Sequence, residues 1–145
     1  MYKSLGIALI RRGKISEAVE PLNKAVEGFT QQSKDSPKSL QVYENLAGSY
    51  SALAQVNGAL ENTEDTLAAH KGAINTYKIA ARLDPANVNY HVEAIKALLY
   101  IGESDKAIKV LDSAVDVMLK YKQQNQADAL RQFRNNILQQ LQGQQ

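Results

Sequence analysis

The sequence of 145 residues has no cysteine and no tryptophan, and only three prolines and eight glycines. Without cysteine there are no disulfides, no thiolate ligands for a metal ion and no thiol nucleophile. The scarcity of proline and glycine leaves long uninterrupted segments, which favour helices. The absence of cysteine also agrees with a cytoplasmic location, which is the compartment we expect.

Strong charge and long hydrophobic runs are also missing. The net charge is only +2, so the chain has no strong electrostatic attraction to nucleic acid. No apolar run approaches the roughly 18 residues that a membrane span needs, so we expect no membrane insertion. The N-terminus does not resemble a signal peptide, because Arg11, Arg12 and Lys14 follow the apolar stretch instead of preceding it.

What the sequence does contain is a recurring pattern of small residues. It reads Ala18-x-x-x-Leu22-x-x-Ala25, then Ala73-x-x-x-Tyr77-x-x-Ala80, then Ala107-x-x-x-Leu111-x-x-Ala114. The last step, from Ala73 to Ala107, is 34 residues. Alanines at this period let antiparallel helices approach closely, and the pattern is typical of a helical-repeat array.

Apolar residues at helical spacing predict seven helices. The first covers residues 2–12 and ends at a turn formed by Gly13. The second is capped by Ser16, with Pro21 in its first turn or just after. The polar stretch 31–39 separates it from the third, which starts at Ser36-Pro37.

Later helix boundaries follow from further turn signals. Asn57-Gly58 marks a turn that the third helix can run past. The fourth helix closes at Leu83-Asp84-Pro85, the fifth begins near Asn87 and ends near Gly102, and the sixth carries the last of the spaced alanines. A final helix, rich in glutamine, occupies residues 123–145.

These residues resemble the tetratricopeptide repeat family. Three degenerate copies of its motif are present: Leu5-Gly6, Leu9, Gly13, Ala18, Leu22 and Ala25; Leu46-Ala47, Tyr50, Ala73, Tyr77, Ala80 and Pro85; Ala94-Ile95, Leu98, Gly102, Ala107, Leu111 and Ala114. The resemblance implies an all-α solenoid of three antiparallel helix pairs, at about 1–32, 37–86 and 87–121. Together these repeats span residues 1–122, and the helix at 123–145 caps them.

The chain departs from the family pattern in three places. The step from Tyr50 to Ala73 is 23 residues where the pattern needs nine. We interpret 56–66 as the tip of an elongated second hairpin, with a disordered loop as the alternative. About seven extra residues near 33–39 also belong to this hairpin, which should therefore protrude. Met1 falls inside the first helix, so we expect the chain to be the C-terminal part of a longer protein.

The resemblance implies a groove for a protein or peptide partner, lined by the first helix of each pair. Its exposed residues would be Lys3, Ile7, Ile10, Arg11, Gln41, Glu44, Asn45, Gly48, Asn89, Val92, Glu93, Lys96 and Tyr100. Asn45 and Asn89 would hold a peptide main chain, since asparagine both donates and accepts. Acidic groups of the partner would meet Lys3, Arg11 and Lys96. An apolar side chain of the partner would contact Ile7, Val92 and Tyr100. The alternative is that these are ordinary exposed residues.

Some family members clamp a terminal carboxylate, and here only Lys3 and Asn45 match that clamp. Glu93 would repel a carboxylate, so we do not expect this ligand. We also expect no enzyme activity, metal or cofactor, because His70 and His91 have no partner at helical spacing. We expect His91 in the core, and His70 either facing solvent or packed against the first repeat.

The glutamine-rich tail has two interpretations. In the first, its apolar residues cover the last repeat and its amides face water. In the second, the tail and the long second hairpin form a structural oligomerisation module, which would make the chain a homo-oligomer. Lys120, Lys122, Arg131 and Arg134 form a mild basic patch, but without interleaved aromatic residues it is a poor nucleic-acid signature.

Overall fold

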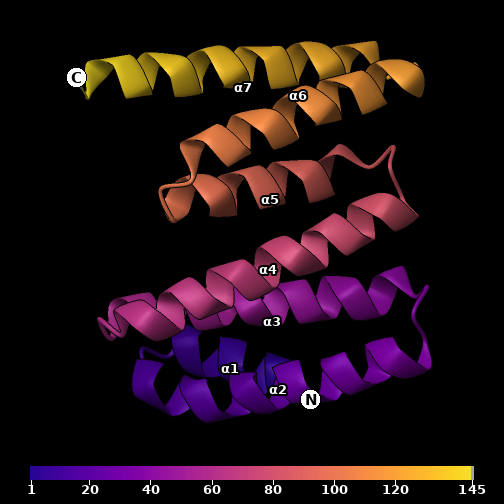
Figure 1. The fold of residues 1–145 in the computed structure, drawn as a ribbon. Coiled ribbons are helices and arrows are strands. Elements are labelled where there is room, and N and C mark those ends of the chain that lie inside the picture. Colours follow the sequence, from indigo (N-terminus) through magenta and orange to yellow (C-terminus); the bar gives the residue numbers. More distant parts are fainter. Residues whose placement is uncertain (145) are drawn as a thin grey trace.

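The computed structural model describes residues 1–144, and this part of the chain consists of seven α-helices without a strand (Figure 1). The helices are α1 Tyr2–Arg11, α2 Ile15–Asp35, α3 Leu40–Ala59, α4 Thr63–Leu83, α5 Val88–Tyr100, α6 Ser104–Lys120 and α7 Gln124–Gly143. The prediction of an all-helical fold is confirmed. None of the described helices is long and apolar enough to cross a membrane.

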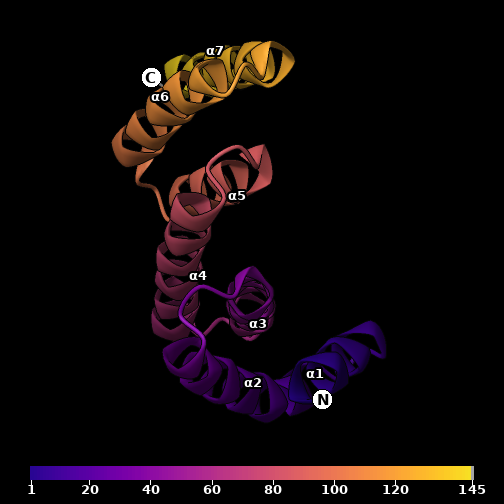
Figure 2. The same ribbon diagram turned by 90° about the vertical axis from the view of Figure 1, so that its right-hand side faces the viewer.

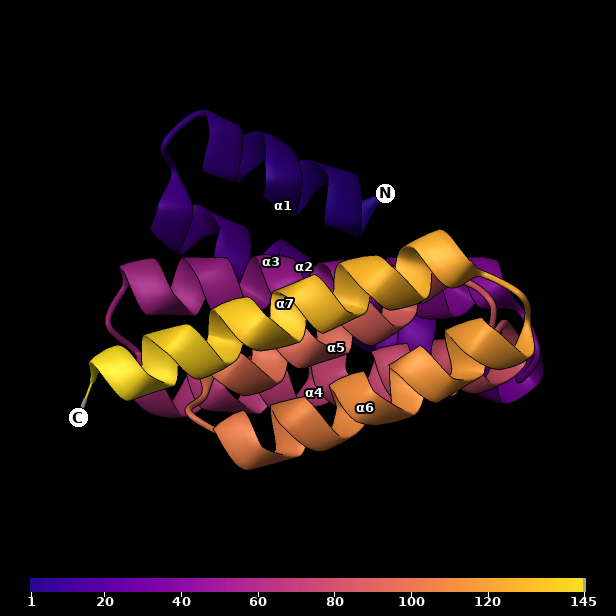
Figure 3. The same cartoon turned by 90° about the horizontal axis from the view of Figure 1, so that it is seen from above.

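The helices stack in the order of the sequence. Each packs against the next, and α1 also contacts α3. Figure 2 shows that the stack bends into an open arc, with α1, α3 and α5 on the inner side, α2, α4 and α6 on the outer side, and α7 at the upper end. From above, α1 lies displaced to one side of the other helices (Figure 3). The arc therefore leaves an inner side that no helix of this chain covers.

The spaced alanines lie at helix contacts, as their pattern predicted. Ala18, Ala107 and Ala114 are fully buried, as are Leu22 and Leu111 beside them. One core cluster joins the helices around α6, and a second joins α2 to the hairpin of α3 and α4. A third lies around Tyr43, Ala80 and Tyr90. The core is thus a series of small interfaces between neighbours, without one central core.

Four tight turns share one geometry, the Schellman motif. At Gly13 and Gly102 the backbone has φ of +75° and +81°, which glycine adopts without steric cost. The N–H of Lys14 donates to the carbonyl oxygen of Leu9 at 2.9 Å, and the N–H groups of residues 62, 103 and 123 make the equivalent bond. Glu61 and Lys122 take the left-handed position in the other two turns.

Several predicted helix starts are wrong. Helix α2 begins at Ile15, so Ser16 lies inside it and does not cap it. Pro21 therefore falls in the second turn, where it has no N–H to donate to the carbonyl of Glu17. The helix then runs to Asp35, through residues predicted to be a linker.

Ser36-Pro37 does not start the third helix, which begins three residues later at Leu40. Its cap is Ser39, whose hydroxyl oxygen accepts from the N–H of Val42 at 3.4 Å. The Pro37 carbonyl is used outside the helix, where it accepts from the Tyr43 hydroxyl at 2.8 Å. The segment between α2 and α3 is therefore a turn with its own hydrogen bonds.

The inserted residues extend a helical hairpin and do not form a disordered loop. Helices α3 and α4 have 20 and 21 residues, and α3 continues through Asn57-Gly58. Helix α2 is as long as α4 and packs against Leu53 and Val56, so the hairpin is covered on that side. On the other side α5 has only 13 residues, and the α3–α4 turn extends beyond it (Figure 1).

Candidate functional site

The inner side of the arc holds a hollow between α3, α4 and α5, which we call the inner hollow. It has a volume of about 140 Å³ and is lined by Ser51 of α3, by His70, Ala73 and Tyr77 of α4, and by Glu93, Lys96, Ala97 and Tyr100 of α5. Three of the predicted groove residues on α5, which are Glu93, Lys96 and Tyr100, thus line one hollow together with side chains of α3 and α4. Burial raises the pKa of Tyr77 above its ordinary value.

Lys3 and Asn45, predicted to lie in the groove, contact each other across α1 and α3. The ammonium of Lys3 lies 3.5 Å from the side-chain oxygen of Asn45, to which it donates. Gly48 leaves room for this lysine, because a Cβ on Gly48 would lie 2.8 Å from Lys3 Nζ. The amide nitrogen of Asn45 remains available as a donor, whereas Lys3 is already engaged.

Glu44 and Tyr90 link α3 to α5. The Tyr90 hydroxyl donates to the Glu44 carboxylate, and Tyr90 is only 6% exposed. Burial, followed by the hydrogen bond and charge of Glu44, raises the pKa of Tyr90 to about 12. Glu44 is therefore not a free groove residue. Sequence reasoning missed Tyr90, although it lies one turn before the buried Ala94.

Lys96 and Glu93 form an ion pair on α5, with Nζ and Oε1 3.6 Å apart. Both side chains are about half exposed, and such pairs contribute little stability. A ligand carboxylate would compete with Glu93 for this lysine.

The other predicted groove residues divide into packed and exposed ones. Val92 packs against the core cluster around α6, and Ile10 against the cluster between α2 and the α3–α4 hairpin. Ile7 and Arg11 line a shallow hollow on α1 together with Arg12. Gln41, Asn89 and Arg11 are exposed. The side chains free to meet a ligand are thus fewer than the sequence predicted.

His70 is partly exposed and packs against α5, so the alternative that it packs against the first repeat is wrong. Its ring stacks on Tyr100 of α5, with centroids 4.7 Å apart. Burial lowers the pKa of His70, which favours the neutral ring. His91 is only half-buried, and its Nε2 lies 3.1 Å from the Pro85 carbonyl, so it is bound at a turn and is not in the core.

A second hollow lies beyond the His70–Tyr100 pair, and we call it the notch. It has a volume of about 310 Å³ and is lined by Gly58, Glu61, Thr63, Thr66, Leu67, His70, Tyr100 and Ile101. His70 and Tyr100 line both hollows. The sequence analysis did not find the notch, although the spacing of Thr63, Thr66, Leu67 and His70 places them on one helix face.

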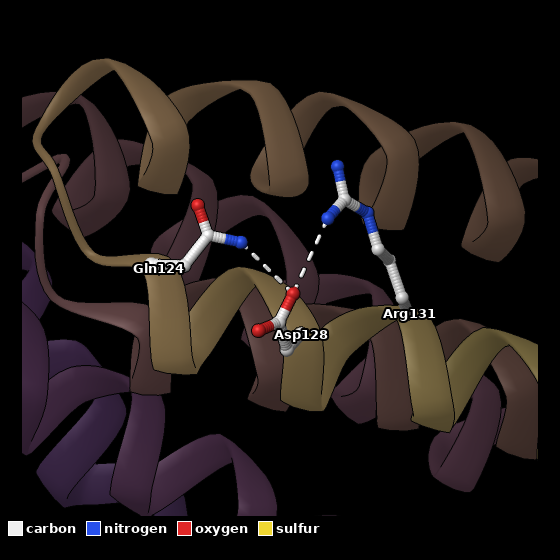
Figure 4. Close-up of polar contacts among 3 residues, drawn as sticks. All are labelled: Gln124, Asp128 and Arg131. Carbon is white, nitrogen blue, oxygen red and sulfur yellow. Dashed lines mark hydrogen bonds and ion pairs between the residues drawn. The ribbon is translucent and has the colours of Figure 1, made fainter.

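The outer face of α7 is polar. Asp128 accepts from Gln124 at 2.9 Å and from Arg131 at 3.3 Å (Figure 4). Arg134 pairs with Asp112 of α6 at 2.9 Å. These acids pair with the two arginines of the predicted basic patch, and no large apolar side chain of α7 is exposed within the described residues. Buried Ala127, Leu130 and Ile137 pack on the α6 cluster.

Residues 1–144 contain no group of three or more histidine, aspartate or glutamate side chains placed to hold a metal ion. No protein-family model matches the chain, and a search of curated proteins found no significantly similar sequence.

Proposed function

We propose that this chain is a tetratricopeptide-type scaffold that binds a peptide or a protein segment on the inner side of its arc. The observation that carries the proposal is the inner hollow, where three helices bring together Ser51, Tyr77, Glu93 and Lys96 at the bottom of an uncovered concave side. Hydroxyls and charged groups beside apolar walls are the mixture that peptide and ligand sites use.

The polar groups on either side of this hollow suit an extended main chain. Asn45 keeps a free amide nitrogen, and Asn89 is exposed at the start of α5. A peptide main chain offers alternating donors and acceptors, which asparagine can match. Arg11 is exposed and makes no ion pair in residues 1–144, so we propose that it meets an acidic group of the partner.

The proposed role is non-catalytic, since the groups in the inner hollow form no nucleophile held by a base. The polar outer face of α7 supports a capping role for that helix over the alternative of self-association. We propose no cofactor.

A peptide library displayed on phage tests this function. Peptides selected on the wild-type chain should bind the double variant Asn45→Ala, Asn89→Ala at least about tenfold more weakly, because each lost hydrogen bond to a buried main chain costs about 1 kcal/mol or more. The matched control is Asn75→Ala, Asn135→Ala, which removes exposed asparagines from α4 and α7. Equal binding to both double variants, or no selected peptide, would contradict the proposal.

A further inference from the structure

The notch exists because two packed antiparallel helices differ in length. Helix α5 ends at Tyr100, where its ring meets His70 of α4. Residues 63–69 of α4 lie beyond that contact, toward the α3–α4 turn. At 1.5 Å per residue they extend about 10 Å. These residues belong to the elongated part of the second hairpin.

The walls of the notch are mainly apolar and accessible. Leu67 is 39% exposed and Tyr100 is 77% exposed. Leu60, in the adjacent turn, is 36% exposed. Exposed apolar residues that gather at one place indicate a contact surface more strongly than scattered ones do. The volume of about 310 Å³ is at the small end of ligand sites, so it suits a single large side chain.

No lysine or arginine lines the notch itself. Residues 39–70 contain no lysine or arginine, and their acidic residues are Glu44, Glu61, Glu64 and Asp65. None of the last three makes an ion pair within the described part of the chain. Glu64 and Asp65 suit the N-terminus of α4. Glu61 lies outside that helix, in the turn, and lines the notch directly.

We propose that the notch is an anchor pocket that takes one aliphatic or aromatic side chain of the bound peptide, with a lysine or arginine next to it that meets Glu61 and Glu64. This assignment rests on the proposed function, since it names the chemistry of the segment bound on the inner side. His70 and Tyr100 line both the inner hollow and the notch, so one extended chain can occupy both.

A second copy of this chain also carries an exposed apolar side chain near basic residues, which is the combination proposed for the ligand of the notch. Leu5 is 47% exposed on α1, and the basic residues Arg11 and Arg12 lie on the same helix or directly after it. Occupation of the notch by α1 of another molecule is therefore an outcome that the experiment must distinguish.

The probes are three synthetic nine-residue peptides of glycine and serine with blocked ends. The first has a central leucine flanked by lysines, the second a central leucine flanked by glutamates, and the third a central serine flanked by lysines. Binding is measured on the isotopically labelled chain by NMR, which detects weak complexes and locates them. We expect the lysine–leucine peptide to shift the amide signals of residues 61–70 and 100–102, with an affinity at least about fivefold higher than either other peptide.

Two sets of variants test the apolar and the charged part separately. Tyr100→Ala should weaken binding of the lysine–leucine peptide about tenfold, as truncation of an aromatic contact residue does. Its control is Tyr121→Ala, at an exposed site of the α6–α7 turn. The double variant Glu61→Lys, Glu64→Lys should invert the preference, so that it binds the glutamate–leucine peptide more tightly than the lysine–leucine peptide. Lysine is compatible with the left-handed backbone there, because Lys122 has it in the equivalent turn. The control is Glu27→Lys with Asp116→Lys.

Inversion of the preference, confined to the Glu61 and Glu64 variant, supports the proposal. The proposal is overturned if the amide signals that shift lie outside the notch, or if the three peptides bind with equal affinity. It is also overturned if the Glu61 and Glu64 variant still prefers the lysine–leucine peptide. Sedimentation without peptide must show a monomer, because an assembly lost in the Tyr100 variant would make a second copy the occupant and overturn the proposal. If phage-selected peptides depend on Asn45 and Asn89 but not on the notch, the anchor assignment fails while the proposed function stands.

Discussion

At the scale of single residues, the closest helix contacts depend on the absence of a side chain. A Cβ on Gly6 would lie 2.5 Å from Cγ of Leu22, which is fully buried and has no space to move. A Cβ on Gly72 would contact the ring of Tyr50 too closely in the same way. Glycine at these positions lets α1 approach α2 and lets α4 approach α3, as the family pattern implies for Gly6.

Gly6→Ala should therefore destabilise the protein by about 1–3 kcal/mol, as overpacking of a core does. Gly28 is the control, because it is exposed in α2 and a Cβ there would meet nothing within 4 Å. Gly28→Ala should stabilise the protein by up to about 1 kcal/mol through helix propensity. Urea unfolding measures both, and equal effects of the two substitutions would show that the Gly6 contact has no steric role.

The Tyr90–Glu44 hydrogen bond is a second feature at this scale. Tyr90→Phe should cost about 1.5 kcal/mol at neutral pH, the low end for a bond to a charged group, because water can still solvate Glu44. The pKa of Tyr90 is raised from 10.0 to about 12 in the folded protein, so folding favours the protonated phenol. The stabilisation is therefore complete below pH 10 and decreases as the pH rises toward 12.

The difference in unfolding free energy between wild type and Tyr90→Phe, measured from pH 7 to 12, checks this prediction. It should be constant up to about pH 10 and shrink above it. A constant difference over the whole range would contradict the pKa assignment. The difference isolates Tyr90, because the two proteins are identical at every other position.

At the scale of elements, the sequence predicted the ends of helices well where a glycine or proline stops the helix. Gly13, Gly102 and Asp84-Pro85 end helices where predicted, within two residues. Helix starts were less predictable, because Ser16, Ser36 and Ser39 all have capping chemistry and only tertiary contacts choose among them. Helix α3 runs on past Asn57-Gly58, as the sequence analysis allowed, and the buried Asn57 accepts from Asn62 at 3.4 Å through its side-chain oxygen.

The serine caps give a direct prediction. Ser39→Ala should destabilise the protein by about 1 kcal/mol, because it removes the acceptor for the Val42 N–H. Ser16→Ala should be neutral or slightly stabilising, since Ser16 is an exposed residue inside α2. Thermal unfolding followed by circular dichroism compares the two. A larger loss at Ser16 would mean that Ser16 is the cap and that α2 begins two residues later, at Glu17.

The candidate site was harder to predict than the elements. Periodicity placed Lys3, Asn45 and Lys96 on suitable helices, but it does not say which side chains pair with one another. The Lys3–Asn45, Glu44–Tyr90 and His70–Tyr100 contacts join residues 30 or more positions apart. The notch depends on the length of α4 relative to α5, which only the completed stack makes visible.

At the scale of the whole molecule, we expect stability to be a sum of neighbouring interfaces, as in linear arrays, because each helix packs mainly against the next. Removal of α7 tests this. A chain ending at Lys122 loses the cover over α6, where Leu111 and Met118 are fully buried and Val115 is 8% exposed. We expect a lower melting temperature and association through the uncovered face, whereas the complete chain should be monomeric by light scattering.

Two substitutions in the complete chain act as controls for the truncation. Ile137→Ala should cost about 2–5 kcal/mol, because this side chain is 4% exposed on the covered face. Gln139→Ala on the exposed face should be neutral. A complete chain that is dimeric and becomes monomeric after truncation would contradict the capping role and favour the oligomerisation module.

The central claim is that the inner side of the arc binds a peptide, and NMR mapping of a phage-selected peptide tests it most directly. The account predicts that the shifted amide signals belong to α3 and α5, with α1 at one end and the start of α4 at the other. Shifts confined to the outer surfaces of α2, α4 and α6, with Asn45 and Asn89 unaffected, would contradict it.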